Sequence, residues 1–188
     1  FYVRAFEAWV QGQGYNDAKG AIEKALTEFK AAKKEKVVIS TLSWAADAFV
    51  NVEKLDYGAE LLMELLEIFT DSRDEKEVAI TLSKLERLVE RLEEVGQFQN
   101  ASDVLAKMAK TYLLTDVARA RKVASKLVSL AHMSYKKQQL YLATSILNNA
   151  FGIYYQLHDE KEAERLADQM TEVAFEFFSL AISKRGTA

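Results

Sequence analysis

The sequence predicts an all-α fold: a right-handed superhelix of stacked antiparallel helical hairpins, an α-solenoid of about nine helices. Three observations predict it. The chain contains no proline, which suits long unbroken helices. Its apolar residues follow the helical period over almost the whole length, and no strand-like alternation persists beyond a few residues. The same pattern of apolar and small residues returns every 40 to 43 residues, which is typical of a helical repeat array.

The repeat is clearest between residues 82 and 112, where two amphipathic segments flank a turn at residues 95–98. Counted with Leu85 as position 4, its template occupies positions 4, 7, 8, 11, 20, 24 and 27: Leu85, Leu88, Val89, Leu92, Ala101, Leu105 and Met108. Shifted along the chain, the template meets mostly apolar or small residues in three further units and a terminal helix. Position 20 is always small: Ala18, Gly58, Ala101 and Ala143. We therefore expect a close approach of two helices there.

The periodicity predicts nine helices at residues 1–12, 15–33, 35–52, 56–70, 74–95, 98–113, 116–134, 137–156 and 159–183. Asp74 precedes Glu77, and Asp159 precedes Glu162, at the spacing of a helix-capping box. Gly14, Gly58 and Gly96 are expected at or near turns.

We interpret residues 1–188 as one repeat domain, cut from a longer chain. Its units cover about 1–33, 35–70, 74–113 and 116–156, followed by the terminal helix at 159–183.

Chemistry-bearing motifs are scarce. The chain has no cysteine, two isolated histidines (His132 and His158) and no glycine-rich phosphate loop. The net charge of −3 does not favour nucleic acid or a membrane surface, and no apolar run is long enough to span a membrane. We therefore expect no enzyme activity, metal or cofactor, and we place the chain in the cytoplasm.

The template spacing resembles that of the tetratricopeptide repeat (TPR) family, over nearly the whole chain. The period of about 42 residues is longer than the usual 34, and the family's helix-ending proline is absent, so long-period members are the better comparison. Helical hairpins of the HEAT type share the longer period and remain a structural rival. The lysines and asparagines with which the family clamps a terminal carboxylate are missing.

The resemblance implies that the first helix of each hairpin lines a groove that binds a partner. Carried onto this chain, the groove residues are Trp44, Asp47, Asn51, Glu86, Arg87, Glu90, Glu94, Val128, His132, Tyr135, Phe175 and Phe178. The middle of this surface is acidic, and its end is apolar and aromatic. We expect a basic amphipathic segment of another protein to bind there. For Trp44, Phe175 and Phe178, burial between helices is the alternative to an exposed position.

The predicted function is a protein-interaction scaffold or adaptor. Two alternatives stay open: a regulatory or sensor domain that binds a short peptide or small ligand, and an oligomerisation module. A deep closed pocket would favour the first alternative. An unpaired apolar surface at residues 175–182, with a dimer in solution, would favour the second.

Overall fold

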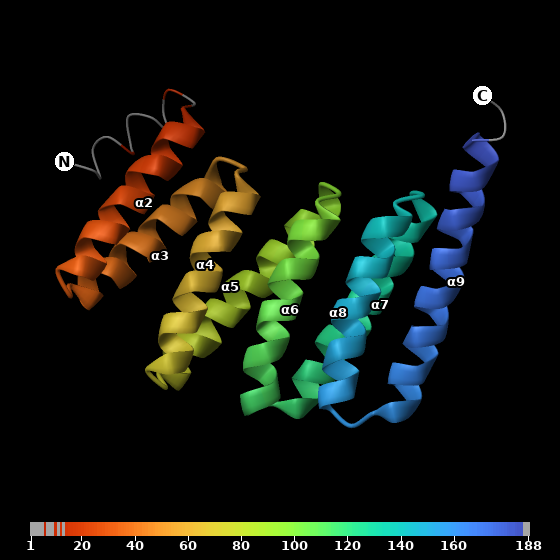
Figure 1. The fold of residues 1–188 in the computed structure, drawn as a ribbon. Helices are drawn as coiled ribbons and strands as arrows, with labels where there is room; N and C mark the ends of the chain where they lie inside the picture. The colour runs from red at the N-terminus through yellow and green to blue at the C-terminus, as the bar shows by residue number, and fades with distance from the viewer. Residues whose placement is uncertain (1–5, 7–9, 11, 13, 186–188) are drawn as a thin grey trace. The chain divides into compact units, whose positions relative to one another are not determined.

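The computed structural model describes residues 6, 10, 12 and 14–185, with side-chain surroundings up to residue 179. Within that part the regular secondary structure is entirely α-helical, without a strand. Its helices are α2 (Tyr15–Ala31), α3 (Glu35–Asn51), α4 (Leu55–Asp71), α5 (Glu75–Glu94), α6 (Phe98–Thr115), α7 (Val117–Lys136), α8 (Leu140–Gln156) and α9 (Glu160–Arg185) (Figure 1). The all-α class is confirmed. The predicted first helix, at residues 1–12, lies mostly outside the described residues. Of it the structure describes Phe6 and Val10, which are helical, and Gly12.

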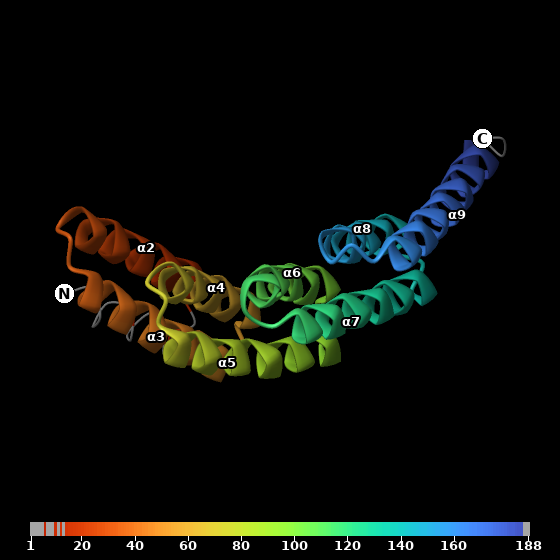
Figure 2. The ribbon, with the colours of Figure 1, turned by 90° about the horizontal axis from the view of Figure 1, so that it is seen from below.

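The chain forms two compact units, Phe1–Arg91 and Leu92–Ala188. In the first unit, consecutive helices alternate between two layers, with α2 and α4 on one side and α3 and α5 on the other (Figure 2). In the second unit, α7 packs against both α6 and α8, and α8 packs against α9. Each unit is therefore built from consecutive antiparallel hairpins. No helix in the described part of the chain is long and apolar enough to cross a membrane.

The repeat template forms the core of both units. In the hairpin of α3 and α4, its members are all buried: Leu42, Ala45, Ala46, Phe49, Gly58, Leu62 and Leu65. In α7 and α8 the equivalent residues are buried as well, including Ser134, the one polar member. A stripe repeated at positions 4, 7, 8 and 11 lies on one face of a helix, so it can be covered by the helix that follows.

Aspartates begin three of the described helices by capping backbone N–H groups. The N–H of Glu77 donates to Oδ1 of Asp74 at 3.2 Å, and that of Glu162 donates to Oδ1 of Asp159 at 3.4 Å. Both predicted caps are confirmed. Asp116 joins α6 directly to α7 and accepts from the N–H of Arg119 at 3.1 Å. Such a cap satisfies a donor that the first helical turn would otherwise leave unpaired.

Six helices in the described part of the chain end in the same kind of turn, with one residue in the left-handed backbone region. These residues are Lys33, Glu53, Arg73, Gly96, Gln138 and His158, with φ between 53° and 75°. The next residue donates its N–H back to a carbonyl five residues earlier, as Gln97 does to Leu92 at 2.8 Å and Gln139 to Ser134 at 3.0 Å. This is the Schellman ending of a helix, and glycine fits it with the least strain.

Glycine supplies the left-handed residue in only one of these six turns, at Gly96. Two substitutions at such turns in the second unit should therefore change the free energy of unfolding in opposite directions. Gly96→Ala should lower the free energy of unfolding by about 1–2 kcal/mol, since alanine is strained in the left-handed region. Gln138→Gly should raise the free energy of unfolding, by up to about 1 kcal/mol, because it relieves the same strain while adding freedom to the unfolded chain. Urea unfolding followed by circular dichroism measures both, and equal signs for the two variants would contradict the interpretation.

Candidate partner-binding site

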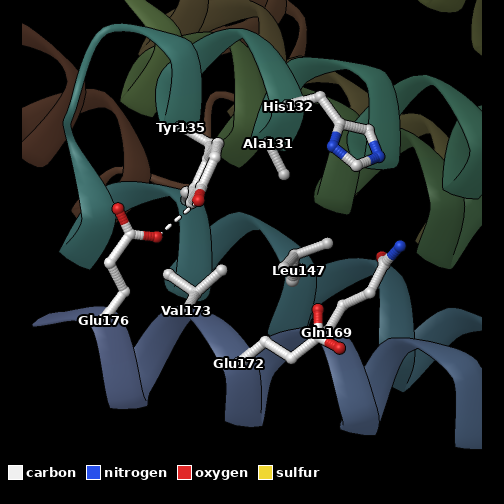
Figure 3. Close-up of a pocket in the computed structure, with 9 residues that line it drawn as sticks. Ala131, His132, Tyr135, Leu147, Gln169, Glu172, Val173 and Glu176 are labelled. Carbon is white, nitrogen blue, oxygen red and sulfur yellow. Dashed lines mark hydrogen bonds between the residues drawn. The ribbon is translucent and has the colours of Figure 1, made fainter.

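A cleft in the second unit brings together side chains from α7, α8 and α9 (Figure 3). Its volume is about 210 Å³, and it is lined by Ala131, His132, Tyr135, Ala143, Leu147, Gln169, Glu172, Val173 and Glu176. Two of the predicted groove residues, His132 and Tyr135, belong to this set. Helical spacing explains the arrangement, because residues three or four apart share one face of a helix.

The floor of the cleft is apolar and its rim is polar. Ala131, Ala143, Leu147 and Val173 are buried, whereas His132, Tyr135, Glu172 and Glu176 are exposed. In the close-up, α7 carries His132 and Tyr135 along one side, and α9 carries Gln169, Glu172 and Glu176 along the other. The cleft therefore offers an apolar surface with an aromatic ring and carboxylates around it.

Tyr135 and Glu176 close one end of the cleft. The hydroxyl of Tyr135 donates a hydrogen bond to Oε2 of Glu176 (Figure 3). This hydrogen bond, together with the negative charges of Glu176 and Glu172, raises the pKa of the Tyr135 phenol above its ordinary value. The interaction holds the ring of Tyr135 in place, although the residue remains 39% exposed.

Gln169 lines the opposite end of the cleft from α9, below His132 in the close-up. Its Oε1 atom is buried and has no hydrogen-bond partner among the described residues. Buried polar atoms are nearly always paired, so an acceptor of this kind favours a donor from outside the chain. Neither Gln169 nor Glu176 was predicted from the sequence. Gln169 lies three residues before Glu172, and Glu176 lies four residues after it. This spacing places all three on one face of a helix and could have identified them.

Three predictions about apolar groove residues have different outcomes. Val128 is buried, with 9% of its surface exposed, so the expectation that it offers open apolar surface is wrong. Val128 lies one helical turn from Ala124, which is fully buried. Because α7 packs on both α6 and α8, its buried stripe is wide enough to include Val128. Phe175 and Phe178 are 69% and 63% exposed, so their burial between helices is excluded. Phe177, at template position 11, is also 49% exposed, unlike its buried counterparts.

In the first unit, the predicted groove residues of α3 have mixed surroundings. The ring of Trp44 is half-buried and lies against Phe6, with ring centroids 4.6 Å apart. Asp47 is exposed, and its Oδ1 accepts from Nζ of Lys84 on α5 at 2.8 Å. Asn51 is exposed at the end of α3. These contacts leave Asp47 less able to attract a basic segment than the sequence predicts, because Lys84 already neutralises much of its charge.

On α5, Glu86, Arg87 and Glu90 are exposed in the first unit, and Glu94 is exposed in the second. Next to them, Arg91 pairs with Glu53 and donates to the carbonyl of Val50 at 3.3 Å. The exposed acidic residues are therefore interspersed with bonded cations. A single groove that runs from Trp44 to Phe178 stays a prediction.

A smaller cavity of about 100 Å³, which was not predicted from the sequence, lies between α2 and α4, with Phe49 of α3 in its wall. Two of its glutamates are in ion pairs: Nζ of Lys19, which also lines the cavity, lies 2.6 Å from Oε2 of Glu60, and Glu64 pairs with Lys30. Burial disfavours the charged form of Lys19, but its hydrogen bond and charge interaction with Glu60 outweigh that and raise the pKa of Lys19. Its polar groups already pair with one another, so this cavity is a weaker candidate.

No group of three or more histidine, aspartate or glutamate side chains in the described part of the chain could hold a metal ion. That enzyme activity and cofactors are absent stays a prediction, because no observation tests it.

Comparison with known proteins gives distant structural similarities only. No protein-family model matches the chain, and no curated protein matches it. The structure described as "Crystal structure of BtubC (BKLC) from P. vanneervenii" is 15% identical, with a TM-score of 0.37 over 92% of this chain and 78% of that chain. The structure described as "Circular tandem repeat protein with novel repeat topology and enhanced subunit contact surfaces" is also 15% identical, with a TM-score of 0.37. That match covers 92% of this chain and 43% of that chain. Neither similarity says what this chain binds.

The class of protein follows from the chain's own hairpins. Consecutive antiparallel pairs bury the same seven-position template, once in the first unit on α3 and α4 and again in the second on α7 and α8. A supersecondary element that recurs with one core pattern defines a helical repeat protein.

Proposed function

We propose that this chain is a TPR-like interaction module that binds a basic, amphipathic segment of another protein. The observation that carries the proposal is the cleft between α7 and α9, where an apolar floor is bordered by Tyr135, Glu172 and Glu176. Helical repeats use extended surfaces of this kind to bind partners. A helix laid across the mouth of this cleft would bury a side chain on the floor and keep its cations near the carboxylates.

Selection of peptides tests the proposal with partners of any sequence. A displayed library of short peptides is selected on the immobilised chain, and the enriched peptides are measured by surface plasmon resonance. We expect basic amphipathic sequences, and we expect Tyr135→Ala to speed their dissociation because an aromatic anchor is worth about 1–2 kcal/mol or more. Tyr141→Ala is the matched control, since Tyr141 is 82% exposed and does not line the cleft.

Charge on the first unit should affect the rate of encounter. Glu86→Lys combined with Glu90→Lys should slow association with a basic peptide and flatten its dependence on salt, because screening acts over about 8–10 Å near physiological ionic strength. Helicity should be unchanged, since both residues are exposed. Peptides that bind Tyr135→Ala as durably as the parent, and that bind the double-lysine variant as fast at low salt, would overturn the groove assignment.

A second candidate function is self-association, and it is favoured by the exposed phenylalanines of α9. Phe175, Phe177 and Phe178 are each about half exposed or more, and the rings of Phe177 and Phe178 meet edge to face with centroids 6.1 Å apart. Soluble monomers seldom leave such a patch open. Sedimentation velocity should then show a dimer that Phe175→Ser with Phe178→Ser converts to a monomer. A concentration-independent monomer of the parent would exclude this function.

A further inference from the structure

We propose that the cleft between α7 and α9 is a binding site for one arginine side chain, supplied by the partner segment. This inference deepens the proposed function and rests on it for the source of the arginine. It is supported by the shape of the cleft, the acceptors at its rim and the buried oxygen of Gln169.

The shape suits a long side chain with a polar end. The cleft holds about 210 Å³, which is enough for one side chain but not for a whole helix. Two of the residues that line this space, Ala131 of α7 and Ala143 of α8, have small side chains. The buried Leu147 and Val173 offer an apolar surface to the methylene groups of an arginine, whose stem packs well on such surfaces.

The charge of the cleft is negative. Glu172 and Glu176 both line it, and Glu172 forms no ion pair with any described residue. His132 is the only basic residue among those lining the cleft. A cation that enters would therefore meet two carboxylates. The raised pKa of Tyr135 agrees with a negative local potential.

The acceptors are spread across the cleft, which favours a guanidinium over an ammonium group. Gln169 Oε1 is buried at one end without a partner among the described residues, Glu172 lies between, and Glu176 holds Tyr135 at the other end (Figure 3). A guanidinium has five N–H donors in a plane, so it can donate to two neighbouring acceptors, such as Gln169 and Glu172, at the same time. The compact ammonium of lysine could satisfy fewer of these groups at once.

Binding of single amino acids to the intact chain tests this site. The probes are N-acetyl-arginine amide, N-acetyl-lysine amide and N-acetyl-citrulline amide, which matches arginine in shape but lacks the charge. We follow nitrogen-15 spectra, including the side-chain amide of Gln169. Arginine should shift that amide and saturate, and citrulline should bind roughly tenfold more weakly or worse, as expected for hydrogen bonds that lose a charged donor. Lysine should fall between the two.

Variants locate the binding. Glu172→Gln and Gln169→Leu should each weaken arginine binding by roughly tenfold, because each removes one acceptor for a charged donor. Glu164→Gln is the control, since Glu164 is an exposed glutamate of α9 that does not line the cleft, and it should leave binding unchanged. Equal binding of arginine and citrulline, no binding of arginine, or binding that Glu172→Gln and Glu164→Gln affect alike would each overturn the inference.

The two proposals fail in different ways. If selected peptides bind at the cleft without any arginine, the arginine site is wrong and the proposed function stands. If arginine amide binds the cleft but no peptide can be selected, the site stands and segment binding is wrong.

Discussion

Replacing Ala101 with glutamate is expected to unfold the second unit, wholly or in large part. Ala101 is the small residue at template position 20 of its repeat and is fully buried in α6. A glutamate there would place a charge in the core without a cation to pair with it. Uncompensated buried charges typically cost about 3–5 kcal/mol, which is a large part of the roughly 5–15 kcal/mol that stabilises a domain.

Two companion variants test whether burial causes this effect. Ala118→Glu introduces the same side chain at an exposed alanine in the first turn of α7, where a negative charge is tolerated or slightly favourable. Ala101→Ser keeps the residue small and should cost far less than the glutamate. Urea unfolding measures the loss of stability, and hydrogen exchange of α6, α7 and α8 shows where it falls. If Ala101→Glu unfolds at the same urea concentration as Ala118→Glu, position 20 does not control the packing.

The core could be predicted from the sequence because it depends on periodicity alone. Leu85 and Leu127 both occupy position 4 of the template and Leu130 occupies position 7, and all three are fully buried. A helix with an apolar stripe has few ways to cover it, so the stripe predicts the hairpins. The helix ends were predicted to within a few residues for a similar reason, since Asp74 and Asp159 are capping residues by chemistry.

The turns could not be predicted in the same way. Lys33, Glu53, Arg73, Gln138 and His158 adopt the left-handed region, which their side chains do not favour. The hydrogen bonds of the helix ending impose that conformation, and among these turns only Gly96 indicates it by residue type. Gly58, expected at or near a turn, lies inside α4, where its role is the close approach that its repeat position predicts.

The candidate site was predicted in part. His132 and Tyr135 lie in the cleft, as their first-helix positions suggest, but Val128 is buried because neighbouring helices cover α7 from two sides. The width of a buried stripe depends on how many helices pack on it, and a periodic pattern in one helix does not contain that number. Gln169 and Glu176 were missed because the template describes the core face and not the seam between α7 and α9.

Gly58 provides the second large expected effect, because a larger residue there would separate α3 from α4. A Cβ atom at Gly58 would lie 2.5 Å from Cγ2 of Val50 and 3.4 Å from the carbonyl oxygen of Ala46. Gly58→Leu should therefore lower the free energy of unfolding of the first unit by about 2–3 kcal/mol, as overpacked cores do. Gly20→Leu is the matched control in the same unit. A Cβ at Gly20 would have no described atom within 4 Å, so this variant should be neutral or gain up to about 1 kcal/mol from helix propensity.

Removing the opposing methyl groups shows whether the clash itself causes the loss. Val50→Ala in the Gly58→Leu background should restore part of the lost stability, although in the parent it should only destabilise. The rescue should be incomplete because the carbonyl oxygen of Ala46 belongs to the backbone of α3 and cannot move away separately. A double-mutant cycle on urea unfolding gives the coupling, which should be at least about 0.5–1 kcal/mol for residues in direct contact. Strict additivity of Gly58→Leu and Val50→Ala would show that the two helices do not depend on this contact.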